Sequence, residues 1–409
     1  MEKFSLLFER KKIIVLLTIF LSFCNFAVYT SSFSSSIGGT TISFTPASTD
    51  ESTSLVLNTF FGIQLQLNKY FSLDGKFSTE TENIANSDFL EEIPATFTID
   101  SASIAYRFET RSFSGQATTF IGSFELPGTD TFGKKYLGIQ NIISPLLCPQ
   151  TSLFTAKGYS IDGIGFSIGG KFETPTAAGF YIYYNNKEDY VEDDGSAVYN
   201  DFLNFDTRIA HVSDNFFMDF VWGASFPLKT EIIDDDLYIS TDVEFHAMTT
   251  MVIGGNPYTN IFIQGGISRI ETNLDDSDSY ISLSDIYVFL EPRFATKKLR
   301  FSFSLFCLPE DEVSNLENID NSTGTAFSLS SMPIIIFDTP GEIGSIFSAS
   351  VPNPAIETYS IDNLDFQIAP YMHLFVGLGE CNTSLHIYPL RYTDIGSMFM
   401  YTIGYKLKI

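Results

Sequence analysis

The chain has 409 residues and is strongly acidic, with 23 Lys and Arg residues against 49 Asp and Glu residues and a formal net charge of −26. Nucleic acids are bound through Lys and Arg, so this balance argues against nucleic acid as a partner. The four cysteines, Cys24, Cys148, Cys307 and Cys381, are too widely spaced for a disulfide framework or a metal motif.

The N-terminus has the features of a secretory signal. Three basic residues at positions 10–12 precede an apolar stretch from Ile13 to about Cys24, and Ser- and Thr-rich sequence follows. This order is typical of an export signal, and the stretch is shorter than the roughly 20 apolar residues of a spanning helix. We therefore expect a signal peptide at 1–30 and a mature domain at 31–409. An uncleaved anchor and a lipidated cysteine are the alternatives.

Beyond the signal, apolar residues recur at every second position, which is the pattern of strands with two unlike faces. No later apolar run is long enough to cross a bilayer as a helix, so a membrane-embedded chain must form a closed barrel. The first hairpin turns at Asn68-Lys69. Its apolar faces carry Leu55, Leu57, Phe61, Ile63, Leu65 and Leu67 before the turn and Phe71, Leu73 and Phe77 after it.

The same alternation returns at 216–228, at 237–247 and at 286–305. No helical period of comparable length is found outside the signal, which indicates an all-β chain. Short turns alternate with longer, mostly acidic connections, as the periplasmic turns and outer loops of outer-membrane barrels do. The short turns lie near 68–69, 109–112, 173–177, 213–215 and 295–298, and the long connections near 80–96, 127–158, 187–201, 229–236, 271–280 and 309–324.

The predicted fold is a transmembrane antiparallel up-and-down β-barrel with long acidic extracellular loops. It has about 16 strands, within a range of roughly 14 to 18, because such barrels usually have an even number. One connection, around Gly254-Gly255-Asn256-Pro257, is longer in this interpretation than a periplasmic turn should be.

The alternation continues to the last residue of the chain. One face carries Phe399, Tyr401, Ile403, Tyr405, Leu407 and Ile409, and the other carries Thr402, Gly404, Lys406 and Lys408. This end resembles the β-signal of bacterial outer-membrane proteins, in which a polar residue, a glycine and two hydrophobic residues hold fixed positions. Thr402, Gly404, Leu407 and Ile409 fill those positions, with Ile409 where Phe is commonest.

The resemblance covers the signal, the repeating hairpins and the terminus. It implies a location in the bacterial outer membrane, contact with outer-membrane lipid, and recognition by the barrel-assembly machinery. The architecture is similar to that of porin-like proteins. The Phe-, Ser- and Asp-rich strands and the single Trp also resemble those of spirochaete outer-membrane proteins.

We expect no enzyme activity and no cofactor. Gly165-Phe166-Ser167-Ile168-Gly169 has the spacing of a nucleophile elbow, but apolar residues alternate through it as in one continuous strand. Its small residues are expected to keep the lumen open or to let backbones approach closely. No phosphate loop, dinucleotide fingerprint or zinc motif is found. Glu244 and His246 share a strand face, which we interpret as a polar pair facing the lumen rather than a metal site.

The acidic clusters of the long connections are interpreted as solvated loop charge, with divalent-cation binding as the alternative. An aromatic girdle at the membrane interfaces is also expected. Its candidate members are Tyr181, Tyr183, Tyr184, Tyr287, Tyr401 and Tyr405.

A barrel of this size encloses an aqueous space. The residues expected to line it are Gln64, Gln66, Asp74, Lys76, Asp242, Glu244, Arg300 and Lys406. Their mixed charge predicts a channel for passive diffusion of small hydrophilic solutes. The alternatives are a transporter of hydrophobic compounds of the fatty-acid type, because Phe60, Phe217 and Phe289 also fall on inner faces, and a surface adhesin on a barrel scaffold.

Overall fold

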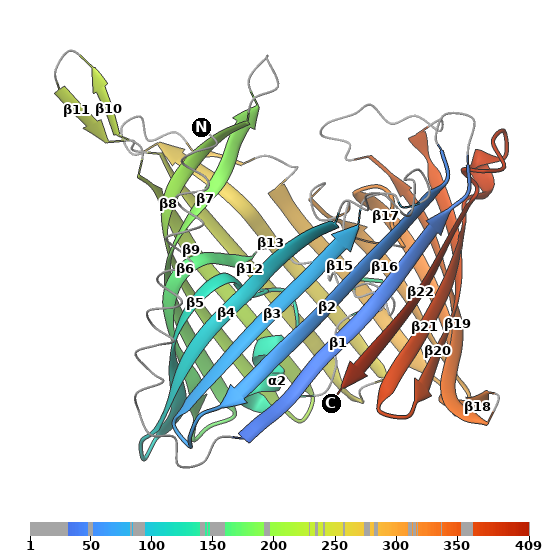
Figure 1. Ribbon diagram of the computed structural model, residues 1–409, viewed down its shortest axis with the longest axis horizontal. Helices are drawn as coiled ribbons and strands as arrows, with labels where there is room; N and C mark the ends of the chain where they lie inside the picture. The colour runs from blue at the N-terminus through green and yellow to red at the C-terminus, as the bar shows by residue number, and fades with distance from the viewer. Residues whose placement is uncertain are drawn as a thin grey trace.

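The chain folds into one closed β-barrel (Figure 1). The computed structural model describes residues 32–47, 52–81, 84, 95–139, 144, 146–147, 160–191, 197–228, 230–233, 236–239, 242–256, 258–273, 279–281, 285–309, 313, 316, 318–336, 338–352 and 363–408. The predicted signal peptide at 1–30 lies outside these residues. No helix in the described part of the chain has the length and hydropathy needed to cross a membrane.

The main sheet has 20 strands, of which β14 and β18 are short additions, so 20 − 2 = 18 strands form the wall. The first wall strands are β1 (Ser32–Thr45), β2 (Ser54–Gln66), β3 (Phe71–Thr81), β4 (Ala95–Glu109), β5 (Phe113–Glu125), β6 (Ile161–Phe172), β7 (Thr176–Val191), β8 (Ala197–Ser213) and β9 (Phe216–Pro227). The others are β12 (Asp242–Asn256), β13 (Thr259–Asn273), β15 (Ile286–Ala295), β16 (Leu299–Cys307), β17 (Thr323–Ser331), β19 (Thr339–Val351), β20 (Asp365–Val376), β21 (Gly379–Ile387) and β22 (Phe399–Lys408).

The remaining elements are β10 (Thr230–Ile233), β11 (Asp236–Ile239), β14 (Ser279–Tyr280), β18 (Ile334–Ile336), the helix α2 (Thr131–Leu137) and the 3₁₀ turn η4 (Pro389–Arg391). Each wall strand pairs antiparallel with its neighbours along the chain, and β22 pairs with β1 to close the sheet. The all-β class and the up-and-down barrel are therefore confirmed. The strand number of 18 lies at the upper end of the predicted range.

The two ends of the barrel differ in the length of their connections, and we call them the turn end and the loop end (Figure 1). The turn end carries the short connections, such as 67–70 and 110–112, as predicted. The prediction of a long connection near Gly254 is wrong, because β12 continues to Asn256 and β13 begins at Thr259. Gly254 has a φ of 135° at an irregularity in this ladder, so it forms a bulge inside the hairpin.

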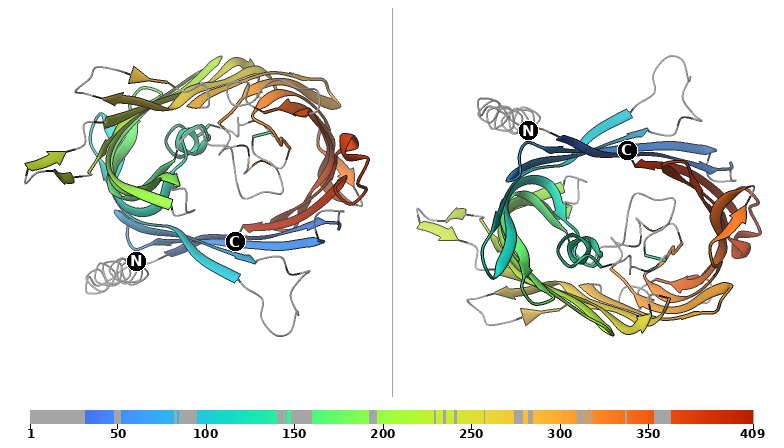
Figure 2. Two further views of the ribbon diagram at one scale, coloured as in Figure 1. Left: turned by 90° about the horizontal axis from the view of Figure 1, so that it is seen from above. Right: turned by 90° about the horizontal axis from the view of Figure 1, so that it is seen from below.

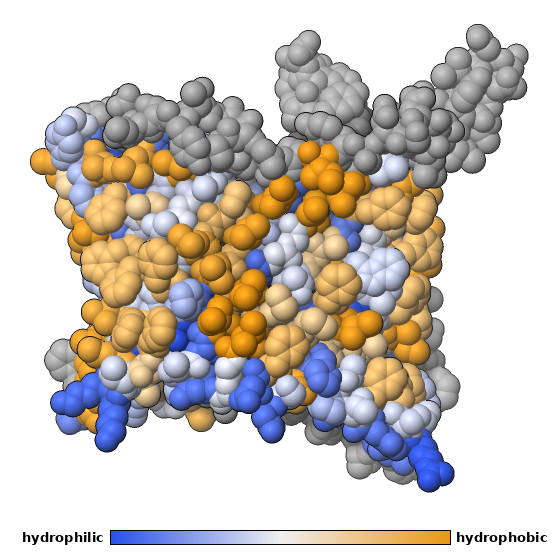
Figure 3. Space-filling model, turned by 180° about the vertical axis from the view of Figure 1, so that it is seen from behind, coloured by the Kyte–Doolittle hydropathy of each residue, from blue (hydrophilic) through white to orange (hydrophobic). Residues whose placement is uncertain are grey.

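The outer face of the barrel is apolar. In β9, Trp222 and Phe226 point outward and are 51% and 40% exposed, whereas Phe217 and Val221 on the opposite face are buried. Figure 3 shows an orange band across the visible side of the barrel, bordered at the turn end by a blue fringe. Apolar surface of this extent is costly in water, so hydrocarbon is its natural surrounding.

Aromatic rings gather outside the barrel near the turn end, but they are not the predicted ones. Tyr70, Phe71, Tyr106, Phe108, Phe113 and Phe172 follow one another with ring centroids 5.1–6.4 Å apart. Of the predicted girdle, Tyr401 and Tyr405 are exposed on the outer face. The prediction is wrong for Tyr181, Tyr183 and Tyr287, because their side chains point inward and are buried. These aromatic residues lie next to the short turns at 67–70, 110–112 and 173–175.

Candidate functional site

The chain that follows β5 turns into the barrel instead of staying outside it. Looking along the barrel, α2 lies inside the ring of strands (Figure 2) and packs against β6, β7 and β8. Phe132 of this helix is fully buried. We call the described residues of 126–147 the inserted loop. The prediction of 127–158 as an outer loop is therefore wrong for its first half.

One arginine of the wall holds the base of the inserted loop. Arg208 of β8 is 0% exposed and donates two hydrogen bonds to Asp219, from Nε to Oδ1 at 2.9 Å and from Nη2 to Oδ2 at 2.5 Å. It also reaches Glu125 at 3.2 Å and the carbonyl of Thr129 at 3.4 Å. Its guanidinium carbon lies 4.6 Å from the ring centroid of Phe132. A buried cation of this kind needs such partners, because desolvation is costly.

A second anchor comes from β13. Gln264 donates from Nε2 to the carbonyl of Gly128 at 2.5 Å and to Thr250 Oγ1 at 3.0 Å. Tyr287 donates its hydroxyl to Gln264 Oε1 at 2.8 Å. Both ends of the buried amide are thereby satisfied, which fixes the loop backbone against the wall.

A third anchor binds the far part of the loop. Ser144 donates to Glu291 Oε2 on β15 at 2.6 Å, and Ser304 of β16 donates to the same oxygen at 2.7 Å. Arg293 donates from Nε to the other oxygen at 2.6 Å. These anchors join segments up to 147 residues apart in the sequence, as in the pair Ser144 and Glu291.

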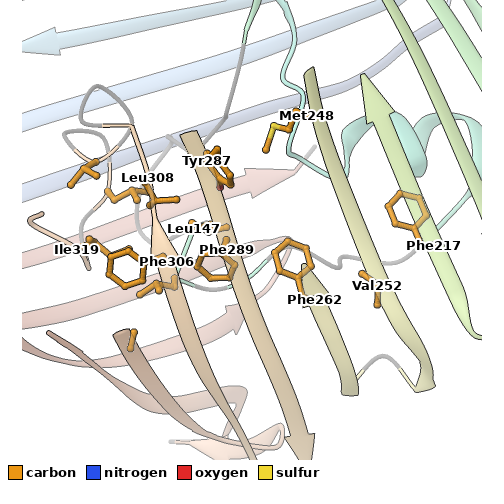
Figure 4. Packing of buried hydrophobic residues seen from close by; sticks show 14 of the residues in the cluster. Leu147, Phe217, Met248, Val252, Phe262, Tyr287, Phe289, Phe306, Leu308 and Ile319 are labelled. Carbon is orange, nitrogen blue, oxygen red and sulfur yellow. The ribbon is translucent and has the colours of Figure 1, made fainter. Parts of the chain in front are cut away.

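Apolar packing completes the attachment. Inward side chains of β9, β12, β13, β15 and β16 form one buried cluster with the inserted loop and with the connection after β16 (Figure 4). The residues labelled there are Leu147, Phe217, Met248, Val252, Phe262, Tyr287, Phe289, Phe306, Leu308 and Ile319. The barrel thus contains a covered wall, formed by β7–β9, β12, β13, β15 and β16, whose inner face is filled by loops.

The small residues of β6 make room for this filling. The hydroxyl of Tyr136 in α2 would lie 3.0 Å from a Cβ added at Gly169. A Cβ at Gly165 would lie 2.5 Å from the carbonyl oxygen of Ile182. The expectation of an open lumen at these residues is therefore wrong, while the expectation of close backbone approach is confirmed. The Gly165–Gly169 segment lies within the continuous strand β6. The pKa of Tyr136 is raised mainly by burial and, to a smaller extent, by the Glu125 carboxylate.

The opposite side of the lumen, the open wall, is formed by the inner faces of β2, β3 and β4. Gln64 pairs across the sheet with Asp74 and forms a hydrogen bond with its carboxylate. Lys76 and Arg107 are exposed, although they point into the barrel. Lys135 of α2, Arg107 and Lys76 all lie within electrostatic range of Asp74. The structure therefore brings three of the predicted lumen residues together with two that the prediction missed, Arg107 and Lys135.

The other predicted lumen residues are dispersed. Arg300 forms an ion pair with Glu342 near the turn end. Lys406 is exposed and lies opposite Gly39 and Glu380 in the sheet. Gln66, at the end of β2, donates to the carbonyl of Phe71 across the turn at 3.1 Å.

Asp242 and Glu244 lie at the loop end of β12. The strand begins at Asp242, whose side chain is outside the described residues, and Glu244 is half-buried. His246 points inward and forms a 2.5 Å hydrogen bond with Asp206. Among the described residues, no three His, Cys, Asp or Glu side chains are grouped as a metal site would need. Most acidic loop clusters lie outside the described residues, so cation binding there stays a prediction.

The predicted assembly signal lies on the closing strand. Thr402 and Gly404 point inward and are buried, and Leu407 is half-buried. Ile409 lies outside the described residues. β22 pairs with both β21 and β1, so this segment closes the sheet. Its recognition by an assembly machinery stays a prediction.

Solved structures that resemble this fold are bacterial porins. OmpF of Salmonella typhi in complex with daunomycin matches with a TM-score of 0.42 at 10% sequence identity, covering 93% of this chain and 97% of that chain. A mutant porin of Rhodopseudomonas blastica matches with a TM-score of 0.41 at 8% identity, covering 93% and 100%. A loop-deletion mutant of OmpT of Vibrio cholerae gives 0.37 at 7% identity, covering 93% and 99%.

No protein-family model and no curated protein matches the sequence. At these TM-scores the resemblance carries no weight for function. The class is defined by the molecule itself, from the closed antiparallel sheet and the apolar outer face. The chain is a closed β-barrel of the outer-membrane type.

Proposed function

We propose that the chain is a channel of the bacterial outer membrane through which small hydrophilic solutes diffuse passively. The observation that carries this proposal is the open wall. Lys76 and Arg107 point into the barrel and stay exposed, although the opposite wall is covered by loops. A sheet of 18 strands encloses more space than its own side chains fill. The inserted loop fills part of that space, and a polar, solvated passage beside the open wall follows.

Export by the signal at 1–30 and closure by the assembly machinery belong to the same proposal. Under this proposal the turn end faces the periplasm and the loop end faces the outside, as in other barrels of this type. Outer-membrane lipid then contacts the apolar outer face, of which Trp222 and Phe303 are examples.

The hydrophobic-compound alternative loses most of its support. It depended on Phe60, Phe217 and Phe289 facing the lumen. Phe217 and Phe289 do face inward, but they are 5% and 0% exposed beneath the inserted loop and the connection after β16. Phe60 is half-buried. A single accessible ring is a poor path for an apolar solute, because continuous apolar lining is what such a solute needs.

Reconstitution into planar bilayers tests the channel. Purified protein should give stepwise conductance. Heat-modifiable gel mobility of the outer-membrane fraction should show that the same preparation is a folded barrel in the expected membrane. A folded barrel that leaves the bilayer silent would contradict the proposal.

An adhesin function is the second candidate, and one observation favours it. β10 and β11 form a two-stranded sheet separate from the barrel, and Figure 1 shows it projecting at the loop end. Deletion of 230–239 should remove binding to host cells or matrix and leave conductance unchanged. The connections 127–158 and 309–324 are unsuitable targets, because their described parts pack inside the barrel.

A further inference from the structure

On the basis of the proposed channel function, we propose that the passage favours small anions carrying carboxylate or phosphate groups. The selecting site is the basic cluster of Lys76 on β3, Arg107 on β4 and Lys135 on α2, which lie within electrostatic range of Asp74, two residues from Lys76 on the same inner face. It lies where the inserted loop faces the open wall. A solute that passes between the two must meet these side chains.

The cluster has more positive than negative charge available to a solute. Asp74 is the carboxylate that all three cations share, and it also accepts a hydrogen bond from Gln64. Lys76 and Arg107 form no ion pair with any described residue, and both are exposed. Unpaired cations that keep contact with water inside a barrel remain free to attract an anion.

The acids beside α2 do not reverse this balance. Lys135 lies 3.7 Å from Glu125, but that carboxylate is buried and is shared with Arg208 at 3.2 Å. Lys134 pairs with Asp130, whose side chain is also buried, while the two lysine side chains keep 36–37% exposure. Glu125 and Asp130 are therefore buried, while Lys134 and Lys135 stay partly exposed.

Other charged side chains at the turn end also contribute to the charge of the lumen. Lys406 adds a further exposed cation on β22. Glu109 is exposed at the end of β4, and Glu380 lies opposite Lys406, where its carboxylate is 3.7 Å from His373. Arg300 and Glu342 neutralise each other. These charges largely cancel, so the preference depends on the cluster around Asp74.

This preference is opposite to what the whole chain suggests. The net charge of −26 and the acidic connections would attract cations to the mouth of the barrel. Charges at a wide, solvated mouth are screened over about 8 Å at physiological salt. Charges in a narrow passage with walls of low dielectric constant are screened less and act on every passing ion. The inner cluster should therefore set the selectivity.

The type of anion follows from the donors. Arginine presents two parallel N–H groups that match a carboxylate or a phosphate, and lysine adds point charge. The cluster contains one Arg and two Lys side chains, two on the open wall and one on α2. A small anion can be bound from both sides and released again, because none of the three cations is locked to one carboxylate.

Reversal potentials across a tenfold KCl gradient test this inference. Wild-type channels should favour chloride over potassium by about threefold, as expected for a unit charge a few ångströms from the ion path in water. The double variant Lys76→Gln with Arg107→Gln should bring this ratio close to one or below it. Inorganic phosphate should reduce the wild-type KCl conductance and have a much weaker effect on the variant.

The matched control is Lys297→Gln with Lys298→Gln, which removes two positive charges at the turn between β15 and β16, outside the lumen. It should keep the wild-type ratio. A cation-selective wild type, or a double variant with unchanged selectivity, would overturn the anion preference and leave the channel intact. A silent bilayer from protein that passes the gel-mobility test would instead overturn the proposed channel function.

Discussion

The strands of the covered wall and of the open wall have similar, apolar outer faces. Their inner faces differ in polarity. In β9 and β15, Phe217 and Phe289 point inward between outward apolar residues, so both faces of these strands carry large apolar side chains. In β2 and β3, Gln64 and Lys76 point inward, and the inner face is mostly polar, with Phe60 as an exception. The inner faces that must be covered and those that stay wet are therefore distinguished by composition.

The difference shows how a wide barrel divides its lumen. Side chains fill a barrel of about eight strands, but not one of 18. Here the chain supplies a second layer from its own connections and attaches it to the covered wall through Arg208, Gln264 and Glu291. In the proposed channel, the open wall borders the passage, and variants on the two walls should behave differently.

The largest expected effect on the covered wall comes from Arg208→Met. Removing the guanidinium leaves Asp219 buried without its cation and leaves Glu125 with Lys135, 3.7 Å away. Loss of one partner from a buried ion pair costs about 3–5 kcal/mol. The free energy of unfolding in detergent should fall by this amount, and channel recordings should become noisier as the inserted loop loosens.

Lys134→Gln provides the matched control. Lys134 also forms an ion pair, with Asp130 at 2.8 Å, but its side chain is partly exposed on α2. Because the lysine is partly exposed and the buried Asp130 makes a further interaction, its loss should cost about 1 kcal/mol, less than that of Arg208. Equal losses for the two variants would show that Arg208 does not hold the loop.

Phe132→Ala should give the second largest effect. Phe132 is fully buried between the inserted loop and the covered wall, and its removal leaves a cavity that costs about 3 kcal/mol. Unitary conductance should rise, because the loop is held less firmly. Phe166→Ala, on the lipid face of β6, should cost about 1 kcal/mol, because lipid can fill the space. A larger loss from the outer residue would contradict the covered-wall description.

The outer half of this architecture could be predicted from the sequence. Apolar residues at every second position predict which face of a strand lies outside. Phe216, Met218 and Phe220 share the outer face as expected. Turn positions followed from where the alternation stops. At Gly254 the prediction failed, because a glycine-rich bulge inside a hairpin has the same composition as a loop.

The inner half could not be derived in the same way. The contact of Arg208 with Glu125 joins residues 83 positions apart, and no local pattern reports such a pair. The sequence does carry one signal of this packing. Phe132, Leu146 and Leu147 are apolar residues in a connection interpreted as exposed and acidic. Together with strands that are apolar on both faces, they indicate a loop that packs inside.

Glycine substitutions in β6 test how closely the covered wall is packed. An alanine Cβ at Gly165 meets the backbone carbonyl of Ile182, which cannot move without disturbing the sheet. Gly165→Ala should therefore cost about 1–3 kcal/mol. At Gly169 the nearest atom is the hydroxyl of Tyr136, a side chain that can shift, so Gly169→Ala should cost less than about 1 kcal/mol. Unfolding in detergent measures both, and a reversed order would contradict the packing of α2 on β6.

The smallest effect on stability, and the sharpest contrast with Arg208, is expected from Lys406→Gln. Lys406 points inward on the closing strand but is exposed, and it lies opposite Gly39 on one side and Glu380 on the other. Substitution at such a position usually changes stability by about 0.5 kcal/mol or less. The reversal potential should still move toward cations, by less than in the Lys76 and Arg107 variant, because Lys406 lies outside the basic cluster near Asp74. Unfolding and reversal potential are measured on one preparation. A loss of stability comparable to that of Arg208→Met would mean that this inward lysine is packed like the covered wall, because a solvated charge leaves no buried partner behind when it is removed.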